Sequence, residues 1–478
     1  MSLMHTTKLP TILIKYIIEY LSDNQHTSGN IGIHYFGYLN KHFNYIIHEL
    51  LYNSLLNLTI QYSNLNKITS YKPNGIIFDR ELLRKNNEIN INIHQYQYID
   101  FKDCSSITDD NVKQGQIEQI TLHTLNMRLC FQITDTPMQY LGGIHTLIIS
   151  YCNNITDDGL KYLGGIHTLD IAHCNKITDN GLQYLRGIHT LDVSCCNLIT
   201  DNGLQYLTGI HTLNMTSCYK ITDNGLKYLM GIHTLNITGC TNVSDNGIKC
   251  LNKIHTLNIS ECDKITNNGL QYLGKRGIHT LTIQGCHLIT NGGLRHLKKI
   301  HTLTIIDCEL IRDDGMIYLQ DVHTLHLESL WVSNIGMQYL KNIYNLTISN
   351  CRCMQNKGLQ SLNNGRINKL TLSGLTKITN NGLKYIKHVN ELYISDNHII
   401  TTDGLIHLQD IKVLTIQNGK NMSIVGKIDL KNKHKCYIDW HNKKMQMKRY
   451  YKTIKNKCRT HLFFIEKCYI ESKKSIKQ

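Results

Sequence analysis

The chain has 478 residues with 51 Lys and Arg, 36 Asp and Glu, and 17 cysteines. No stretch approaches the run of about 18 apolar residues that spans a membrane. The sequence also has no glycine-rich phosphate loop, no HExxH or G-x-S-x-G pattern, no CxxC pair and no opening secretion signal. We therefore expect a non-enzymatic protein without cofactor, metal, small-molecule substrate or membrane contact, in the cytoplasm or alternatively in the nucleus.

Residues 1–50 contain two amphipathic segments. In LPTILIKYIIEYL, at residues 9–21, the apolar residues form one helical stripe, and the proline suits a first helical turn because its missing N–H costs nothing there. The segment YFGYLNKHFNYIIHELL, which begins at Tyr35, has a second such stripe. Together they predict a small helical module, too short to hold a large core alone.

A unit of about 22 residues fills residues 97–420. Its histidine recurs every 22 residues from His123 to His323, with one step of 24, and the frame continues to Lys412 without the histidine. A period of this length is typical of a solenoid. Residues 51–96 lack the period, and we interpret them as a linker and N-terminal cap, because the first unit of a stack would otherwise expose its apolar face.

Each unit predicts a strand followed by a helical turn. In IHTLDIAHC, Leu169 and Ile171 alternate with polar neighbours, as in a strand with one buried face. In NKITDNGLQYL, Thr178 or the aspartate after it can cap a helical turn, and Leu182 and Leu185 face inward. No unit can bury its apolar face alone, so neighbours must stack. We predict an α/β solenoid, a horseshoe with parallel strands on its concave face.

A cysteine stands seven residues after the histidine in most units. The position, at the turn that leaves each strand, suits a small buried thiol. A metal site would need ligands close together, and no such spacing occurs. We therefore predict a ladder of reduced, structural thiols. Its members are Cys152, Cys174, Cys196, Cys218, Cys240, Cys262, Cys286 and Cys308.

The run CNNITDDGLKYLGGIHTLDIAHC resembles the cysteine-containing leucine-rich repeat, in which a cysteine is followed by I-T-D-x-G-L and paired leucines. The resemblance covers about residues 97–419. The units here are shorter than those of most family members, and the cysteine is replaced at Leu330, Leu375, Asn397 and Gly419. Members of that family are commonly substrate-recognition subunits of ubiquitin ligases, with an F-box at the N-terminus.

Residues 1–50 resemble an F-box in their Leu-Pro opening, the close IIEYL and the run LNKHFNYII. Two features depart from the family: Ile12 stands where it has an acidic residue, and the loop NQHTSGN is longer. The resemblance implies a surface that docks a Skp-type adaptor; alternatively, some of these residues fill the module's own core. The residues concerned are Leu9, Pro10, Ile14, Ile17, Leu21, Leu39 and Phe43.

Residues 421–478 form a basic end, in which residues 427–478 carry 16 Lys and Arg against 4 Asp and Glu. Lysines mixed with aromatic residues raise the alternative of a nucleic-acid contact. The segment matches no nucleic-acid motif, so we interpret it as a C-terminal cap with a solvated extension. The composition, rich in Asn, Ile, Lys and Tyr with 3 prolines, is typical of an AT-rich genome. Large amoeba-infecting DNA viruses encode similar proteins, and such an origin would imply the host cytoplasm.

The recurring histidines are expected to stack as a column at the start of the strands. A charged column would repel itself, so we expect most of these imidazoles to be neutral at pH 7. We interpret the repeated histidine as a structural residue that was copied with the unit. The two alternatives are that the column binds metal ions and that it responds to pH.

The outward strand positions are the remaining candidates for function, because a long, mildly polar concave sheet suits a protein partner. We predict the substrate-recognition subunit of an SCF-type (Skp–cullin–F-box) ubiquitin ligase, in which the N-terminal module binds the Skp-type adaptor of a cullin-RING ligase and the solenoid binds an unidentified target. The alternatives are a ligase-independent scaffold and, less favoured, a nucleic-acid-binding protein. The predicted target-binding residues are Asp170, Asp192, Asn214, Asn236, Asn258, Thr216 and Thr238.

Overall fold

The structure is a computed structural model that describes residues 75–77, 98–101, 105, 107–113, 122–363, 365–401, 404, 407–408, 410–417 and 427–428. The predicted F-box-like module at residues 1–50 lies outside the described residues, as do nearly all of the predicted linker and the basic end. These assignments therefore stay predictions. The repeats from residue 122 onward are described almost without a gap.

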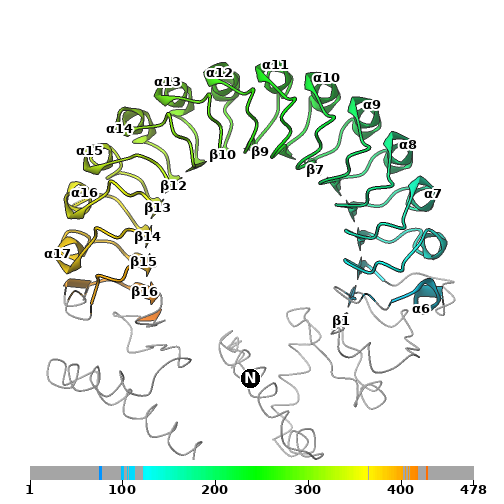
Figure 1. The fold of residues 1–478 in the computed structure, drawn as a ribbon, viewed down its shortest axis with the longest axis horizontal. Coiled ribbons are helices and arrows are strands. Elements are labelled where there is room, and N and C mark those ends of the chain that lie inside the picture. The colour runs from blue at the N-terminus through cyan, green and yellow to red at the C-terminus, as the bar shows by residue number, and fades with distance from the viewer. Residues whose placement is uncertain are drawn as a thin grey trace, which may run out of the picture.

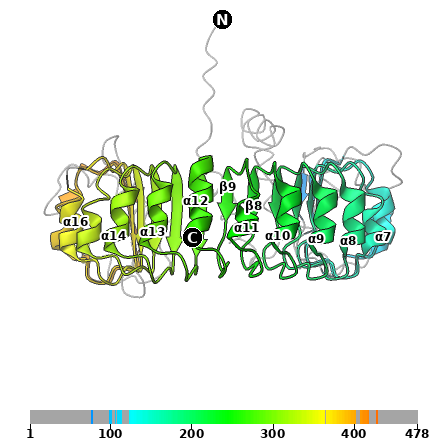
Figure 2. The same cartoon turned by 90° about the horizontal axis from the view of Figure 1, so that it is seen from above.

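The described residues form a curved solenoid whose inner face is one 17-stranded sheet (Figure 1). Strands β1 to β16 pair in parallel in chain order, and β17 pairs antiparallel with β16. Seen from above, the rungs lie next to one another in a single band (Figure 2). The strands are β1 (Gly75–Ile77), β2 (Tyr98–Asp100), β3 (Thr124–Asn126), β4 (Thr146–Ile148), β5 (Thr168–Asp170), β6 (Thr190–Asp192), β7 (Thr212–Asn214), β8 (Thr234–Asn236), β9 (Thr256–Asn258), β10 (Thr280–Gln284), β11 (Thr302–Ile306), β12 (Thr324–Glu328), β13 (Asn345–Ser349), β14 (Lys369–Ser373), β15 (Glu391–Ser395), β16 (Val413–Gln417) and β17 (Lys427–Ile428).

Short helices line the convex face of the solenoid (Figure 1). Most are single turns, because a unit of 22 residues leaves little chain for a helix between the turns. The α-helices are α6 (Asp109–Lys113), α7 (Asp157–Leu160), α8 (Asp179–Leu182), α9 (Asp201–Leu204), α10 (Asp223–Leu226), α11 (Asp245–Ile248), α12 (Asn267–Arg276), α13 (Asn291–Leu294), α14 (Asp313–Met316), α15 (Asn334–Met337), α16 (Asn356–Ser361) and α17 (Asn380–Leu383). The 3₁₀ helices are η4 (Thr136–Tyr140), η5 (Gln183–Leu185), η6 (Gln205–Leu207), η7 (Lys227–Leu229), η8 (Arg295–Leu297) and η9 (Ile317–Leu319).

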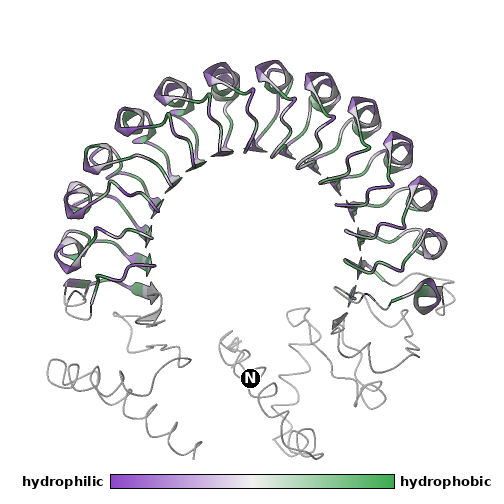
Figure 3. Ribbon diagram, in the orientation of Figure 1, coloured by the Kyte–Doolittle hydropathy of each residue, from purple (hydrophilic) through white to green (hydrophobic). Residues whose placement is uncertain are grey.

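The register explains why the repeat must stack. Leu169 pairs with Leu191, and Leu191 pairs with Leu213, so equivalent leucines form one column inside the sheet. The apolar side chains join into a single continuous core from Ile99 to Leu414. Hydrophobic residues recur in every rung between the strands and the helices (Figure 3). The predicted solenoid with parallel strands on its concave face is confirmed.

Hydrogen bonds hold each helical turn both within its own rung and to the preceding rung. Thr178 caps α8, because its side-chain oxygen accepts the N–H of Asn180 at 3.2 Å. Thr178 is itself held by Asp157 of the preceding rung, whose Oδ1 accepts the N–H of Thr178 at 2.8 Å and whose Oδ2 accepts its hydroxyl at 2.6 Å. The aspartate of the repeat is therefore an inter-rung clamp, whereas the sequence had presented it as one of two candidate caps.

The glycine of each helical turn makes room for this clamp. A Cβ on Gly203 would lie 2.5 Å from Oδ1 of Asp179 and 3.0 Å from Cδ1 of Leu182. We expect Gly203→Ala to lower the free energy of unfolding by about 1–3 kcal/mol, because added volume in a packed site forces its neighbours to shift. Urea unfolding followed by circular dichroism measures the change.

Gly231→Ala provides the matched control, since a Cβ there meets nothing within 4 Å and the backbone keeps a negative φ. This substitution should leave stability unchanged or raise it slightly, because alanine restricts the unfolded chain more than glycine does. Equal losses from both variants would show that the clamp does not explain the glycine.

Candidate functional site on the concave sheet

The predicted target-binding residues lie side by side on the concave face of β5 to β9. Asp170 pairs with Asp192, which pairs in turn with Asn214, and the column continues through Asn236 and Asn258. All five are half-buried. Thr216 and Thr238 stand two residues beyond the strand positions of their own rungs and are also half-buried.

These polar side chains also stabilise the turn that follows each strand. Oδ1 of Asn214 accepts the N–H of Thr216 at 3.2 Å and its hydroxyl at 2.7 Å. Asn236 and Thr238 make the same pair of bonds, at 3.0 and 2.7 Å. Such bonds from Asn or Asp to the backbone two residues on are typical of Asx turns. These Asn and Thr residues therefore stabilise the turn after each strand. The recurring spacing N-x-T in the sequence could have indicated this role.

Asp170 and Asp192 give this part of the face a weak acidic character. Burial is the largest cause that raises the pKa of Asp170; the N–H of Ala172 opposes the shift, and the carboxylate of Asp192 adds to it. Asp192 is stabilised by Nδ2 of Asn214, which donates to its Oδ2 at 2.8 Å. Oδ1 of Asp170 accepts the N–H of Ala172, and Oδ1 of Asp192 accepts the N–H of Ser194, so these atoms also serve the fold.

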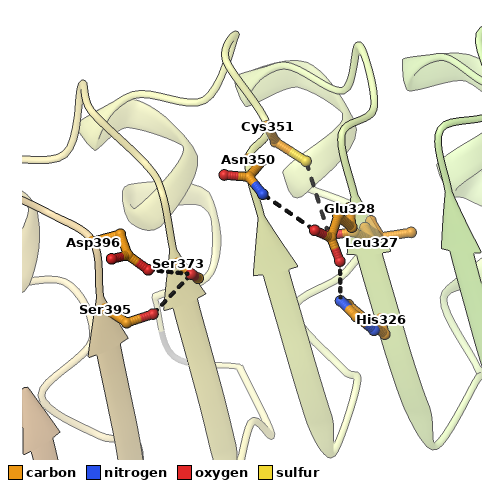
Figure 4. A network of polar contacts seen from close by, with 8 residues as sticks. All are labelled: His326, Leu327, Glu328, Asn350, Cys351, Ser373, Ser395 and Asp396. Atoms are coloured by element: carbon orange, nitrogen blue, oxygen red, sulfur yellow. Dashed lines mark hydrogen bonds and ion pairs between the residues drawn. The ribbon is translucent and has the colours of Figure 1, made fainter. Parts of the chain in front are cut away.

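The far half of the concave face carries larger and more varied side chains. Nε2 of His326, on β12, lies 3.4 Å from Oε2 of Glu328, and Nδ2 of Asn350 donates to Oε1 of the same glutamate at 3.1 Å (Figure 4). On the following strands, Ser395 donates to Ser373 at 2.7 Å. The first group lies on β12 and the turn after β13, and the serine pair lies on β14 and β15. The sequence signal for the first group is the change from Thr304 and Ile306 to His326 and Glu328 at the paired outward positions of β12.

Next to this network, β14 and β15 present a charged and aromatic group. Nζ of Lys369 lies 4.7 Å from the ring centroid of Tyr393, and the Tyr393 hydroxyl lies 3.5 Å from Oε2 of Glu391. Burial, and then the Glu391 carboxylate, raises the pKa of Tyr393. Aromatic side chains are enriched at protein interfaces. We define the concave site as His326, Glu328, Asn350, Lys369, Glu391 and Tyr393.

The ladder cysteines lie away from this face, inside the solenoid. All eight are buried and free. The thiol of Cys174 donates to the carbonyl of Ile149 in the preceding rung at 3.2 Å, and that of Cys218 donates to Val193 at 3.3 Å. Burial is the main cause that raises the pKa of the Cys196 thiol to about 12 and that of Cys240 to about 11. Such thiols are poor nucleophiles and poor metal ligands at neutral pH.

The repeat histidines form a stack of imidazole rings along the rim where the strands begin. Successive rings from His123 to His323 lie 4.2 to 4.6 Å apart between centroids and are 12° to 20° from parallel. Nδ1 of His211 lies 3.1 Å from the hydroxyl of Thr212 beside it, and the other rungs repeat this contact. The lone pairs of stacked parallel rings do not converge on one point, and no group of three or more His, Cys, Asp or Glu among the described residues is placed to hold a metal ion.

This stack predicts an acid-sensitive solenoid. Burial, followed by the charge that the flanking imidazoles would carry, lowers the pKa of His145, His211 and His255 below 6.5. The unfolded chain then binds more protons, so this contribution to stability is complete above pH 6.5 and is lost as the pH falls through the lowered values. Urea midpoints measured between pH 7.5 and 5 should decrease.

The control replaces His189, His211 and His233 with Asn, the residue that the chain itself has at the equivalent Asn368 and Asn390. The variant should lose less stability over the same pH range than the unmodified protein. An identical pH dependence in both proteins would assign the acid sensitivity to other groups.

Comparison with known proteins adds to this geometry. A family model described as Leucine Rich repeat matches residues 144–164, 166–185, 188–207 and 251–274. No curated protein matches the sequence. Within the described residues, no helix has the length and apolar character needed to cross a membrane.

Several solved structures resemble the solenoid. The Rad7–Elc1 complex of yeast matches at 18% identity over 78% of this chain and 95% of the other, with a TM-score of 0.45. The TLR13–ssRNA13 complex matches at 17% identity over 76% and 56%, with a TM-score of 0.47. An internalin, InlF of Listeria monocytogenes, matches at 22% identity over 64% and 88%, with a TM-score of 0.44. The family model and the geometry of the rungs agree that this chain folds as a leucine-rich-repeat solenoid, an architecture of protein-interaction repeats.

Proposed function

We propose that the chain is a non-enzymatic receptor that holds a target protein on its concave sheet and recruits an SCF-type ubiquitin ligase through residues 1–50. The observation that carries the first half is the concave site on β12 to β15. Charged and aromatic side chains gather there, whereas the outward positions of β5 to β9 carry Thr, Asp and Asn. A rigid concave surface with a local group of this kind suits a protein partner.

The second half rests on the resemblance of residues 1–50 to an F-box. Its Leu-Pro opening and the stripe through Leu39 and Phe43 would contact a Skp-type adaptor, and the adaptor would join the receptor to a cullin-RING ligase. In this arrangement the chain needs no catalytic group of its own, because the ligase complex transfers ubiquitin to the bound target. The complex would work in the cytoplasm.

Co-purification of the full chain with a purified Skp-type adaptor tests the ligase half. We expect the unmodified chain to retain the adaptor and Leu9→Ala/Pro10→Ala to lose it. Tyr393→Ala, which changes only the concave site, should retain the adaptor. Circular dichroism of each variant checks that the solenoid is intact.

A ligase-independent scaffold is the second candidate, and the absence of the acidic residue at Ile12 favours it. On that account the unmodified chain and Leu9→Ala/Pro10→Ala would recover equal, background amounts of adaptor. The target would still bind to the concave sheet. That outcome would remove the ubiquitin ligase from the proposal and leave the receptor in place.

A further inference from the structure

Three consecutive rungs carry large apolar side chains at an exposed turn. Leu288, Leu310 and Trp331 follow β10, β11 and β12, on the rim where the strands end, and are 50%, 47% and 51% exposed. With the exception of Leu198, the preceding rungs from β4 onward have Asn or Lys at this turn, so the repeat itself does not require an apolar residue there. The polar residues are Asn154, Lys176, Lys220, Asn242 and Lys264.

Carboxylates border this apolar rim, which we define as Leu288, Leu310 and Trp331. Glu261 and Asp263, at the turn after β9, and Asp307 and Glu309, at the turn after β11, are exposed. Two cations also lie at this rim. The guanidinium carbon of Arg312 lies 5.5 Å from the centroid of the Trp331 ring and covers one side of the indole, and Nζ of Lys264 donates to Oδ1 of Asn242 on the preceding rung at 2.8 Å. The four carboxylates outnumber these two cations. The rim thus combines an apolar centre with an acidic border. A basic polypeptide segment with large apolar side chains would be complementary to both.

We propose that the occupant of the apolar rim is residues 443–465 of the same chain. Between Lys443 and Arg459 the sequence has eight Lys and Arg and no Asp or Glu, and the apolar run LFFI follows at residues 462–465. The basic part would face the acidic border, and the phenylalanines would cover Leu288, Leu310 and Trp331. Each surface would remove the other's exposed apolar area from water.

The length of the intervening chain allows this contact. The last described strand, β17, ends at Ile428 and pairs with β16, which lies four strands along the sheet from β12. Four strand spacings are about 19 Å, and crossing from one end of a five-residue strand to the other adds about 17 Å. Residues 429–461 could span about 110 Å when extended. The distance from Ile428 to the apolar rim is therefore well below the extended length of residues 429–461, and the contact can form within one molecule.

Tryptophan fluorescence of the full chain tests the proposal. The chain has two tryptophans, so Trp440→Phe leaves Trp331 as the single reporter. We expect Trp331 in this background to resist quenching by acrylamide. Adding Phe463→Ser/Phe464→Ser should shift its emission to longer wavelength and remove the protection. Lys455→Glu/Lys457→Glu/Arg459→Glu should have the same effect, because it places negative charge against the acidic border.

Two matched changes serve as controls in the same background. Lys473→Glu/Lys474→Glu alters charge outside the proposed segment, and Leu198→Ser removes an exposed leucine from the same turn of a distant rung. Neither should change the quenching of Trp331, whereas Leu310→Ser should increase it. Equal quenching in all variants would overturn the proposal. Protection that grows with protein concentration would assign the rim to a second copy and overturn the intramolecular contact.

Discussion

Replacing Asp201 with alanine is expected to lower the free energy of unfolding by about 2–4 kcal/mol, one of the two largest effects that the structure predicts. Oδ1 of Asp201 accepts the N–H of Thr222 at 2.8 Å, and Oδ2 accepts the Thr222 hydroxyl at 2.6 Å. Alanine removes the acceptor for both groups at a part-buried contact between two rungs, and each unpaired group costs about 1–3 kcal/mol. Urea unfolding followed by circular dichroism measures the loss.

Asp201→Asn is the informative control, because the chain uses asparagine at this position elsewhere. Asn267 accepts the N–H of Thr290 at 3.0 Å and donates Nδ2 to its hydroxyl at 2.9 Å. We expect this variant to lose clearly less stability than the alanine variant. If asparagine were as damaging as alanine, or if alanine were harmless, the inter-rung clamp would not be what holds the helical turns together.

The second large effect concerns target binding at the concave site. Tyr393→Ala combined with Lys369→Glu removes the aromatic ring and reverses the charge 4.7 Å from its centroid. We expect binding of the target to weaken by about 2–4 kcal/mol, which is roughly 30-fold to 1,000-fold in Kd. Titration calorimetry with a target captured by the unmodified chain provides the measurement.

The convex face supplies a matched control for this variant. Lys384 lies over the ring of Tyr385 with its Nζ 4.9 Å from the centroid, so Tyr385→Ala with Lys384→Glu makes the same chemical change on the opposite side of the solenoid. Its affinity for the target should be unchanged. A larger loss from the convex pair than from the concave pair would place the target on the helices.

The fold could be predicted because every rung repeats the same local pattern. Alternation around Leu169 indicates a strand, the fixed spacing brings Leu191 beside it, and stacking follows because neither leucine can be buried within one unit. The sequence does not show which residue Asp157 contacts. Its partner, Thr178, lies 21 residues further on, and only the path of the chain between the rungs brings them together.

The candidate site was less predictable for a similar reason. Uniform columns such as Asn214 and Asn236 attract attention in the sequence, yet their oxygens are occupied by the turn that follows each strand. The contact between His326 and Glu328 and the contact between Lys369 and Tyr393 depend on side-chain directions at single positions, which periodicity does not determine. The departures from the repeat were therefore more informative about binding than the repeat itself.

Site-specific photo-crosslinking tests whether the concave sheet is the surface that holds a partner. A photoreactive phenylalanine analogue would replace Tyr393 on the concave face in one protein and Tyr385 on the convex face in another. Both proteins would be illuminated in the cell and recovered under denaturing conditions. We predict covalent adducts with a partner protein from position 393 and none from position 385. Adducts from position 385 alone would contradict a receptor that binds its target on the concave sheet.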